Sequence, residues 1–286
     1  MRKTICKSAI LLLILASSLS LSAKKRELEK AGWELGVQSY TFHKFSFQEA
    51  VDKVNQLGLN DIEVYFGQPL GKRMEGTMDF RMDRKTQQLV LDYARSKKVK
   101  IVACGVVVCK DEAEWKQLFE FAGQMGIGLI TCEPEYEHLP YVDQLANEYG
   151  IDVAIHNHPK PSNYWNPDLF LEAVDGLSDR IGACADVGHW KRMGIDPVEG
   201  LKKYEGRIKA LHFKDVKKKA VGEAEQHDVI WGTGILDMKA MLVELKKQGF
   251  EGLFSIEYEY NWENSVPDIQ KSINYFYQTI EKLNQK

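Results

Sequence analysis

The feature that most constrains the fold is an alternation of two hydrophobic periods that repeats eight times after residue 33. Short apolar runs, typical of buried strands, alternate with segments whose apolar residues recur at helical spacing. The apolar runs are Leu35–Thr41, Asp61–Phe66, Lys100–Val108, Leu129–Cys132, Val153–His156, Ile181–Val187, Ile208–Phe213 and Leu253–Tyr258. The helical segments are Phe47–Leu57, Arg84–Lys97, Glu112–Met125, Tyr141–Tyr149, Pro167–Leu177, Pro197–Tyr204, Met238–Lys247 and Pro267–Leu283.

A strand followed by a helix, eight times over, predicts a parallel sheet, because parallel neighbours need crossover connections. Eight such units in about 250 residues match a closed (β/α)8 TIM barrel. An open doubly wound sheet would usually carry a glycine-rich phosphate turn after its first strand, and Ser39–His43 has none. No low-complexity linker divides the chain, so we predict a single α/β barrel domain over residues 33–286.

The N-terminal segment has a different composition from the rest of the chain. A basic stretch, Met1–Lys7, precedes an apolar run, Ala9–Ala16, and small residues follow in Ser17–Ala23. This order is typical of a secretory signal peptide, and the apolar run is too short for a stable membrane anchor. We therefore expect residues 1–23 to be a signal peptide and the mature protein to be exported, periplasmic or extracellular, without a membrane anchor.

Charge and cysteine content exclude several classes of function. The chain has 38 basic and 41 acidic side chains and a net charge of −3, whereas a nucleic-acid partner would normally meet a basic face. The cysteines beyond the N-terminal segment follow neither zinc-knuckle nor CxxC spacing, so we expect small buried side chains. They are Cys104, Cys109, Cys132 and Cys184. The sequence sets no oligomeric state.

In a barrel of this kind the functional side chains come from the carboxyl ends of the strands. Carboxylates and imidazoles gather at those ends, chiefly on the fourth to eighth strands: Glu133, His156, His158, Asp186, His189, His212 and Glu257. One such residue alone is more often a loop cap or an ion-pair partner. Several on consecutive strands predict a site for one divalent ion, such as Mn²⁺, Co²⁺, Zn²⁺ or Mg²⁺. Asp215 and Glu259 are expected to face outwards in ion pairs.

Further side chains at the expected barrel mouth suit a small sugar substrate. Tyr40 and Glu63 end the first two strands, and Trp190 and Trp231 could either stack on a sugar ring or belong to the core. Lys214 could orient a sugar oxygen, or it could pair with its neighbour Asp215. Export argues against a phosphorylated substrate, because sugar phosphates are mainly cytoplasmic.

Several stretches together are similar to those of one known family. They are VAIHNHP at Val153–Pro159, GACADVGHW at Gly182–Trp190, LHFKDV at Leu211–Val216, and WGTGILD at Trp231–Asp237 followed by GFEGLFSIEYE at Gly249–Glu259. With them the chain resembles the sugar phosphate isomerase/epimerase family, which has a xylose isomerase-like TIM barrel. The resemblance covers essentially the whole chain from Gly36 to the last helix, and it is poorly specific for substrate.

The resemblance implies one divalent ion held by an acidic residue of strand five, an Asp of strand six, a His of strand seven and a Glu of strand eight. Asp186, His212 and Glu257 match three of these positions. His156 stands where many relatives have Glu, so we expect Glu133 to supply the missing carboxylate. His156 is then a ligand, a substrate contact or a base. His189 matches a substrate-binding histidine of the family.

The implied activity is isomerisation or epimerisation, in which a proton is removed next to a metal-bound carbonyl to give an enediolate. We expect Glu133, His158 and Glu257 to share the acid and base roles, and Lys214 to stabilise the enediolate. A lyase or hydratase resembling the inositol dehydratases is the alternative, because it begins with the same proton abstraction. Nuclease activity, also known in this superfamily, is not expected because strands two and three end without histidines. A barrel that binds a sugar without turning it over stays open.

Overall fold

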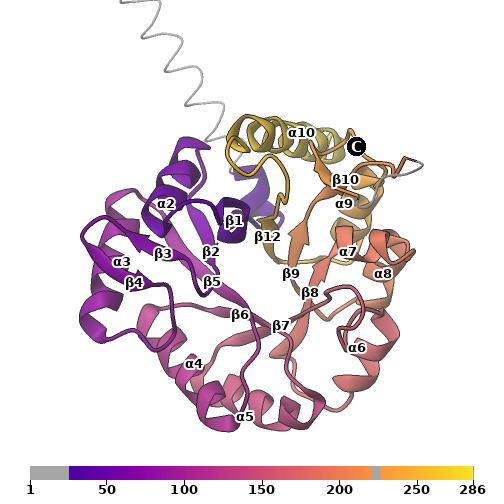
Figure 1. Ribbon diagram of the computed structural model, residues 1–286. Helices are drawn as coiled ribbons and strands as arrows, with labels where there is room; N and C mark the ends of the chain where they lie inside the picture. Colours follow the sequence, from indigo (N-terminus) through magenta and orange to yellow (C-terminus); the bar gives the residue numbers. More distant parts are fainter. Residues whose placement is uncertain (1–25, 221–225, 286) are drawn as a thin grey trace, which may run out of the picture.

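Parallel strands close into a barrel with helices around it in the computed structural model, which describes residues 26–220 and 226–285 (Figure 1). Around the barrel the strands run in the order β1, β12, β9, β8, β7, β6, β5, β2, so the first and last barrel strands of the chain lie side by side. This arrangement confirms the predicted (β/α)8 TIM barrel. The expected signal peptide, residues 1–23, lies outside the described residues.

The eight barrel strands overlap the eight predicted ones. They are β1 (Trp33–Gln38), β2 (Asp61–Val64), β5 (Lys100–Val107), β6 (Leu129–Cys132), β7 (Asp152–His156), β8 (Ile181–Asp186), β9 (Ile208–Phe213) and β12 (Gly252–Ile256). The eight predicted helices are also present. They are α2 (Phe47–Gln56), α3 (Arg84–Ser96), α4 (Glu112–Met125), α5 (Leu139–Tyr149), α6 (Pro167–Ala173), α8 (Pro197–Lys203), α9 (Met238–Lys247) and α10 (Val266–Asn284).

The structure adds short elements that hydrophobic periodicity did not reveal. They are the turns η1 (Ser39–Phe42) and η2 (Tyr136–His138), the ribbon of β3 (Pro69–Gly71) with β4 (Met74–Thr77), the helix α7 (Val187–Arg192), and the ribbon of β10 (Asp215–Val216) with β11 (Asp228–Val229). None of them is longer than six residues. Helix α7 matters most for function, because it follows β8 without a loop.

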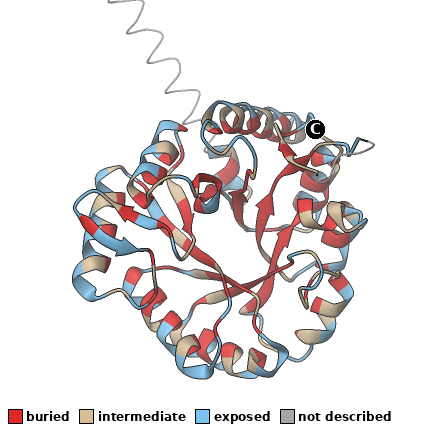
Figure 2. Ribbon diagram, in the orientation of Figure 1, coloured by how far each residue is buried: buried red, intermediate tan, exposed pale blue. Residues whose placement is uncertain are grey.

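Local chemistry explains where the helices begin and end. Ser46 and Glu49 form a reciprocal capping box at the start of α2, and the side chain of Asp111 caps α4. Helix α4 ends at Gly126, whose φ of 69° is left-handed and favours glycine. The helices bury their apolar faces against the barrel and expose the opposite faces, as Figure 2 shows.

A floor of small side chains inside the barrel positions the polar residues above it. This floor is a separate buried cluster of Ala103, Ala154, Cys184, Ala210 and Leu253. Because alternate residues of a strand share a face, the residues two positions further along also point into the barrel. On four adjacent strands these residues are His156, Asp186, His212 and Ser255. The barrel therefore carries a polar layer directly above the floor, at the carboxyl ends of its strands.

The four cysteines predicted to be small buried side chains are indeed buried and free. Burial raises the pKa of the Cys184 thiol to about 11, so this thiol stays protonated at neutral pH. Within the part of the chain that the structure describes, no helix is both long and apolar enough to span a membrane.

Candidate active site

Four buried side chains converge at the carboxyl ends of β7, β8, β9 and β12. They are His156, Asp186, His212 and Glu257, and one ligand atom from each lies within 4.8 Å of the others. We call this set the four-residue group. Nε2 of His156 lies 3.5 Å from Oδ2 of Asp186, and Nδ1 of His212 lies 3.2 Å from Oε2 of Glu257. The pairing of β8 with β9 sets Asp186 opposite His212 and so brings the two ligand types together.

The imidazoles of the four-residue group fit a divalent ion. Nε2 of His156 and Nδ1 of His212 are buried and have no hydrogen-bond partner. Buried polar atoms are normally hydrogen-bonded, so each unpartnered one needs an explanation. Two imidazole nitrogens and two carboxylates directed at one centre form a donor set that suits Zn²⁺, Mn²⁺ or Co²⁺. The residues present therefore fit a metal ion.

A carboxylate behind each imidazole holds the ring in its orientation. Oε2 of Glu63 lies 3.1 Å from Nε2 of His212 and also accepts a hydrogen bond of 2.6 Å from the hydroxyl of Ser255. Oε1 of Glu133 lies 3.0 Å from Nδ1 of His156. Because a carboxylate can only accept, it fixes the proton on the nearer nitrogen and leaves the other nitrogen free to bind a metal.

Asp186 serves both the fold and the four-residue group. Its Oδ1 accepts a hydrogen bond of 2.6 Å from the backbone N–H of His189 and thereby caps helix α7. Its Oδ2 faces the centre of the group. Burial opposes ionisation, but the positive charge of Lys214 outweighs it and holds the pKa of Asp186 well below its usual value. This carboxylate is therefore ionised and available as a ligand.

Lys214 places a buried ammonium group among the carboxylates of the site. Its Nζ lies 2.8 Å from Oδ2 of Asp186, 2.6 Å from Oε2 of Glu257 and 2.8 Å from Oε1 of Glu259. Burial favours the neutral amine, yet these carboxylates outweigh it and raise the pKa of Lys214 well above its usual value. Gly188 gives the side chain room, because a Cβ there would lie 2.5 Å from two Lys214 side-chain carbons.

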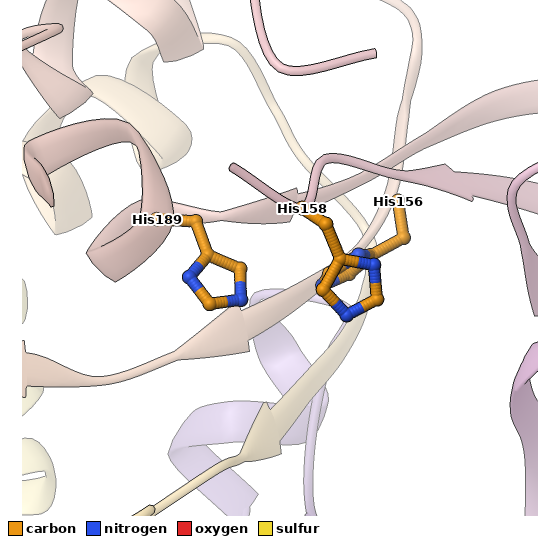
Figure 3. Close-up of side chains that lie close together, drawn as sticks. All are labelled: His156, His158 and His189. Atoms are coloured by element: carbon orange, nitrogen blue, oxygen red, sulfur yellow. The ribbon is translucent and has the colours of Figure 1, made fainter. Parts of the chain in front are cut away.

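Two solvent-facing histidines, His158 and His189, lie next to the buried His156 (Figure 3). Their ring nitrogens also lie close enough to hold a metal, but this set shares His156 with the four-residue group. The His158 ring is half-exposed, and its Nδ1 lies 2.7 Å from Oε1 of Glu133. Glu133 thus binds two imidazoles at once.

Arg192 determines the tautomer of His189. A guanidinium nitrogen of Arg192 lies 3.3 Å from Nδ1 of His189, and because a guanidinium only donates, Nδ1 must accept. Burial lowers the pKa of His189 well below its usual value, so the ring is neutral. The proton therefore sits on Nε2, 3.5 Å from Oδ2 of Asp186, where it can be donated to a ligand oxygen.

A cleft of about 430 Å³ reaches Glu257 of the four-residue group. Its walls include Gln38, Tyr40, Tyr65, His158, His189 and Glu257. The volume lies in the range of small-molecule sites, and the walls combine aromatic faces with titratable groups. This cleft can place a small polar molecule against Glu257 and the solvent-facing histidines. We call it the inner cleft.

The structure brings Asp186, His212 and Glu257 together, but it places Glu133 differently from the expectation. Glu133 lies outside the four-residue group, and His156 takes the fourth position. The physical reason is that Glu133 follows the last residue of β6 and reaches the far nitrogen of His156. It contacts His156 and His158 instead of joining the four-residue group.

Three residues expected to bind substrate do not reach the barrel mouth. Glu63 is fully buried behind the four-residue group. The Trp190 ring packs against Tyr204, with ring centroids 5.1 Å apart, and the Trp231 ring packs against Phe213, with centroids 5.0 Å apart. Both indoles are completely buried, so no face is free to stack on a sugar. Tyr40 and His189 do line the inner cleft.

Two carboxylates expected to face outwards instead point into the protein. Asp215 is buried and accepts hydrogen bonds from the backbone N–H groups of Gly232, Gly234 and Leu236. It therefore holds the loop after β11 and does not form the ion pair with Lys214 that the sequence allowed. Glu259 binds Lys214 and lines the inner cleft. Glu259 lies two residues after Glu257, and the two-residue alternation could have placed it on the same side.

Tyr65, which the sequence places at the end of the second strand, lines the inner cleft. The sequence analysis missed two further aromatic residues at the mouth, Tyr260 and Trp262, which line a neighbouring cleft. Tyr260 and Trp262 follow the last strand in a loop without any period, so only the structure shows their direction.

Comparisons with known proteins agree with this architecture. Residues 51–279 match the family described as xylose isomerase-like TIM barrel. An inosose isomerase of Bacillus velezensis is 22% identical over 253 residues, which cover 77% of this chain and 86% of that protein. An inosose dehydratase of Lacticaseibacillus casei is 24% identical over 126 residues, which cover 40% of this chain and 42% of that protein.

Solved structures share the same barrel. An uncharacterized protein from Parabacteroides distasonis is 37% identical, with a TM-score of 0.70 over 86% of this chain and 98% of that chain. The IOLI protein with a bound zinc atom is 19% identical, with a TM-score of 0.68 over 87% of this chain and 98% of that chain.

Proposed function

Because the chain belongs to the xylose isomerase-like TIM barrel family, we propose that it is a metal-dependent sugar isomerase or epimerase. It would move a proton at a carbon next to a carbonyl group. The observation that carries this proposal is the four-residue group of imidazoles and carboxylates, which the inner cleft reaches at Glu257. The inosose isomerase relative supports the reaction class, and the zinc-bound neighbour supports a divalent ion.

His156, Asp186, His212 and Glu257 would hold the ion. When bound, it would act as a Lewis acid that stabilises negative charge developing on a carbonyl oxygen. The ammonium group of Lys214 adds a second positive charge at the same place, 2.8 Å from Asp186. Preorganised charges of this kind act most strongly in a buried site, because no solvent has to reorganise.

The residues that move the proton approach the inner cleft from two sides. His158 donates from Nδ1 to Glu133, so its Nε2 is free to accept a proton. Burial opposes ionisation of Glu257, but Lys214 and His212 outweigh it and lower its pKa, so this carboxylate is ionised. Because it lines the inner cleft, it is the second candidate base. β8 and β9 separate the strands that carry these residues. The two bases would therefore face opposite sides of a bound sugar, as an epimerase requires.

A dehydratase is the second candidate, and one observation favours it. The fourth residue of the group is His156, an imidazole, and the Glu133 carboxylate is hydrogen-bonded to both His156 and His158. At the end of β7 the available acid or base groups are therefore imidazoles, whereas an epimerase would use a free carboxylate there. An imidazole bound to a carboxylate can protonate a departing hydroxyl group. The dehydratase relative supports this reaction as well.

The test is a thermal-shift screen of free, oxidised and phosphorylated sugars and inososes, followed by incubation of each stabilising compound in D₂O. Deuterium at a carbon of an otherwise intact sugar is the result expected for an isomerase or epimerase. An unsaturated product would assign the dehydratase reaction instead. We expect free or oxidised sugars to stabilise the protein. Binding without any exchange or product would contradict both enzymatic candidates.

A further inference from the structure

A second and larger cleft, of about 670 Å³, lies beside the inner cleft. Its walls include Arg192, His227, Glu259, Tyr260 and Trp262. Both clefts are lined by His189 and Glu259, so they meet at these two side chains. A molecule that fills the inner cleft could therefore extend into the second one without leaving the protein surface. We call the second cleft the outer cleft.

Aromatic rings form much of the wall around both clefts. Tyr260 stacks on His227, with ring centroids 4.0 Å apart and an angle of 20° between the rings. Trp262 meets the ring of His43 edge to face at 4.1 Å and the ring of Tyr40 at 6.0 Å. The rings therefore support one another and keep their positions. Such an array is preorganised to receive a flat, partly apolar ligand.

Two of these rings are unusually exposed for large side chains. Tyr260 is 45% exposed and Tyr40 is 40% exposed. Exposed aromatic groups that cluster around a cleft mark a binding surface, because leaving them in water is unfavourable. A monosaccharide in the inner cleft would contact Tyr40 but would leave Tyr260 in solvent. The outer cleft therefore needs an occupant of its own.

Polar groups in the outer cleft complement the aromatic ones. Arg192 ion-pairs with Asp228 and donates to the backbone carbonyl of Gln226, so its guanidinium group is held in place. Asp228 also accepts a hydrogen bond of 2.7 Å from the backbone N–H of Glu259, which ties the loop after β12 to the same network. The cleft thus presents a fixed donor, Arg192, and a carboxylate acceptor, Glu259, next to aromatic faces.

We propose that the outer cleft binds a second sugar ring, so that the substrate is a glycoside or oligosaccharide whose first ring occupies the inner cleft. A sugar ring has an apolar C–H face that packs on aromatic rings and a rim of hydroxyl groups that hydrogen-bond to charged side chains. The outer cleft offers both kinds of partner. The identity of the first ring as the reacting sugar rests on the proposed function above, and the binding of a second ring does not.

Titration calorimetry of the full chain in buffer containing Mn²⁺ tests this inference. The probes are glucose and galactose, each compared with its α- and β-linked disaccharides, including maltose, cellobiose, gentiobiose and galactobiose. At least one disaccharide should bind about fivefold more tightly than its monosaccharide, because a second aromatic contact contributes on the order of 1 kcal/mol. Tyr260→Ala and Trp262→Ala should each remove most of this preference.

The matched control is Tyr136→Ala. Tyr136 is also 45% exposed, but it lines neither cleft, so its removal should leave the preference unchanged. The inference is overturned if no disaccharide binds more tightly than its monosaccharide, or if Tyr136→Ala lowers the preference as much as Tyr260→Ala. A disaccharide preference without proton exchange in D₂O would keep the second subsite and refute the proposed reaction. Proton exchange in a monosaccharide without any disaccharide preference would support the proposed reaction and refute the second subsite.

Discussion

The two imidazoles of the four-residue group are supported in the same way but in contrasting surroundings. The carboxylate behind His212 is that of Glu63, which is fully buried and also accepts a hydrogen bond from Ser255. The carboxylate behind His156 is that of Glu133, which lies near the inner cleft and also holds His158. We call His212, Glu63 and Ser255 the closed arm, and His156, Glu133 and His158 the open arm. The contrast suggests that one arm only positions a ligand, whereas the other also reaches the substrate.

The largest difference between the arms should appear when His158 is replaced. His158→Ala should lower turnover by about 10²- to 10⁴-fold, the usual contribution of a general acid or base, because the open arm loses its proton carrier. Metal content should stay at the wild-type level, because His158 is outside the four-residue group. Steady-state kinetics and metal analysis of the same preparation measure both quantities. Full activity of the variant would remove the open arm from catalysis.

Replacing the two supporting carboxylates should separate the arms next. Glu63→Gln and Glu133→Gln should each weaken metal binding by about 10- to 100-fold, because each loses the group that orients a ligand imidazole. Only Glu133→Gln should also lower turnover at saturating metal. Competition with a fluorescent chelator gives the metal affinities. Equal turnover losses in both variants would contradict the division into a closed and an open arm.

Acid should weaken metal binding through the open arm. Burial alone would lower the pKa of His156, but Asp186 and Glu133 outweigh it and raise this pKa above the usual 6.5. Below that raised pKa the metal-free protein holds a proton that the ion must displace, so affinity falls as pH falls, starting above pH 6.5. The proton displaced from His156 contributes about tenfold per pH unit to the slope. His156→Gln should flatten the slope, and an unchanged slope in that variant would refute the assignment.

The smallest effect should come from Ser255 in the closed arm. Its hydroxyl donates a hydrogen bond of 2.6 Å to Glu63. Ser255→Ala should weaken metal binding by about fivefold, because one buried hydrogen bond contributes about 1 kcal/mol. Turnover at saturating metal should not change. A large loss of turnover would mean that the closed arm takes part in the reaction after all.

The barrel could be predicted from the sequence because each strand and helix is long enough to show its own period. The predicted strands also locate the strand ends. Asp186, His212 and Glu257 are then neighbours because β8, β9 and β12 are adjacent in the barrel. Helix α7 was missed because it begins directly after β8, and the side chain of Asp186, the last residue of that strand, caps it. Its Trp190 therefore turns into the core instead of the mouth.

Depth inside the barrel could not be predicted in the same way. Glu63 and Glu133 both stand near the end of a strand, yet one lies beneath the four-residue group and the other beside the inner cleft. Which layer a strand-end residue joins depends on the tilt and stagger of the strands, and these are not encoded in one strand's own pattern. The exchange of roles between Glu133 and His156 has the same origin.

The central claim is that His156, Asp186, His212 and Glu257 together hold one divalent ion. The most direct test is the metal content of the wild-type protein and of the Asp186→Asn/His212→Ala double variant after equilibration with Mn²⁺ or Zn²⁺ and gel filtration. Circular dichroism of both proteins should show that the barrel is folded. We expect a single equivalent in the wild type and less than about a tenth of an equivalent in the variant, because two of the four ligands are gone. A folded variant that retains a full equivalent would contradict the account.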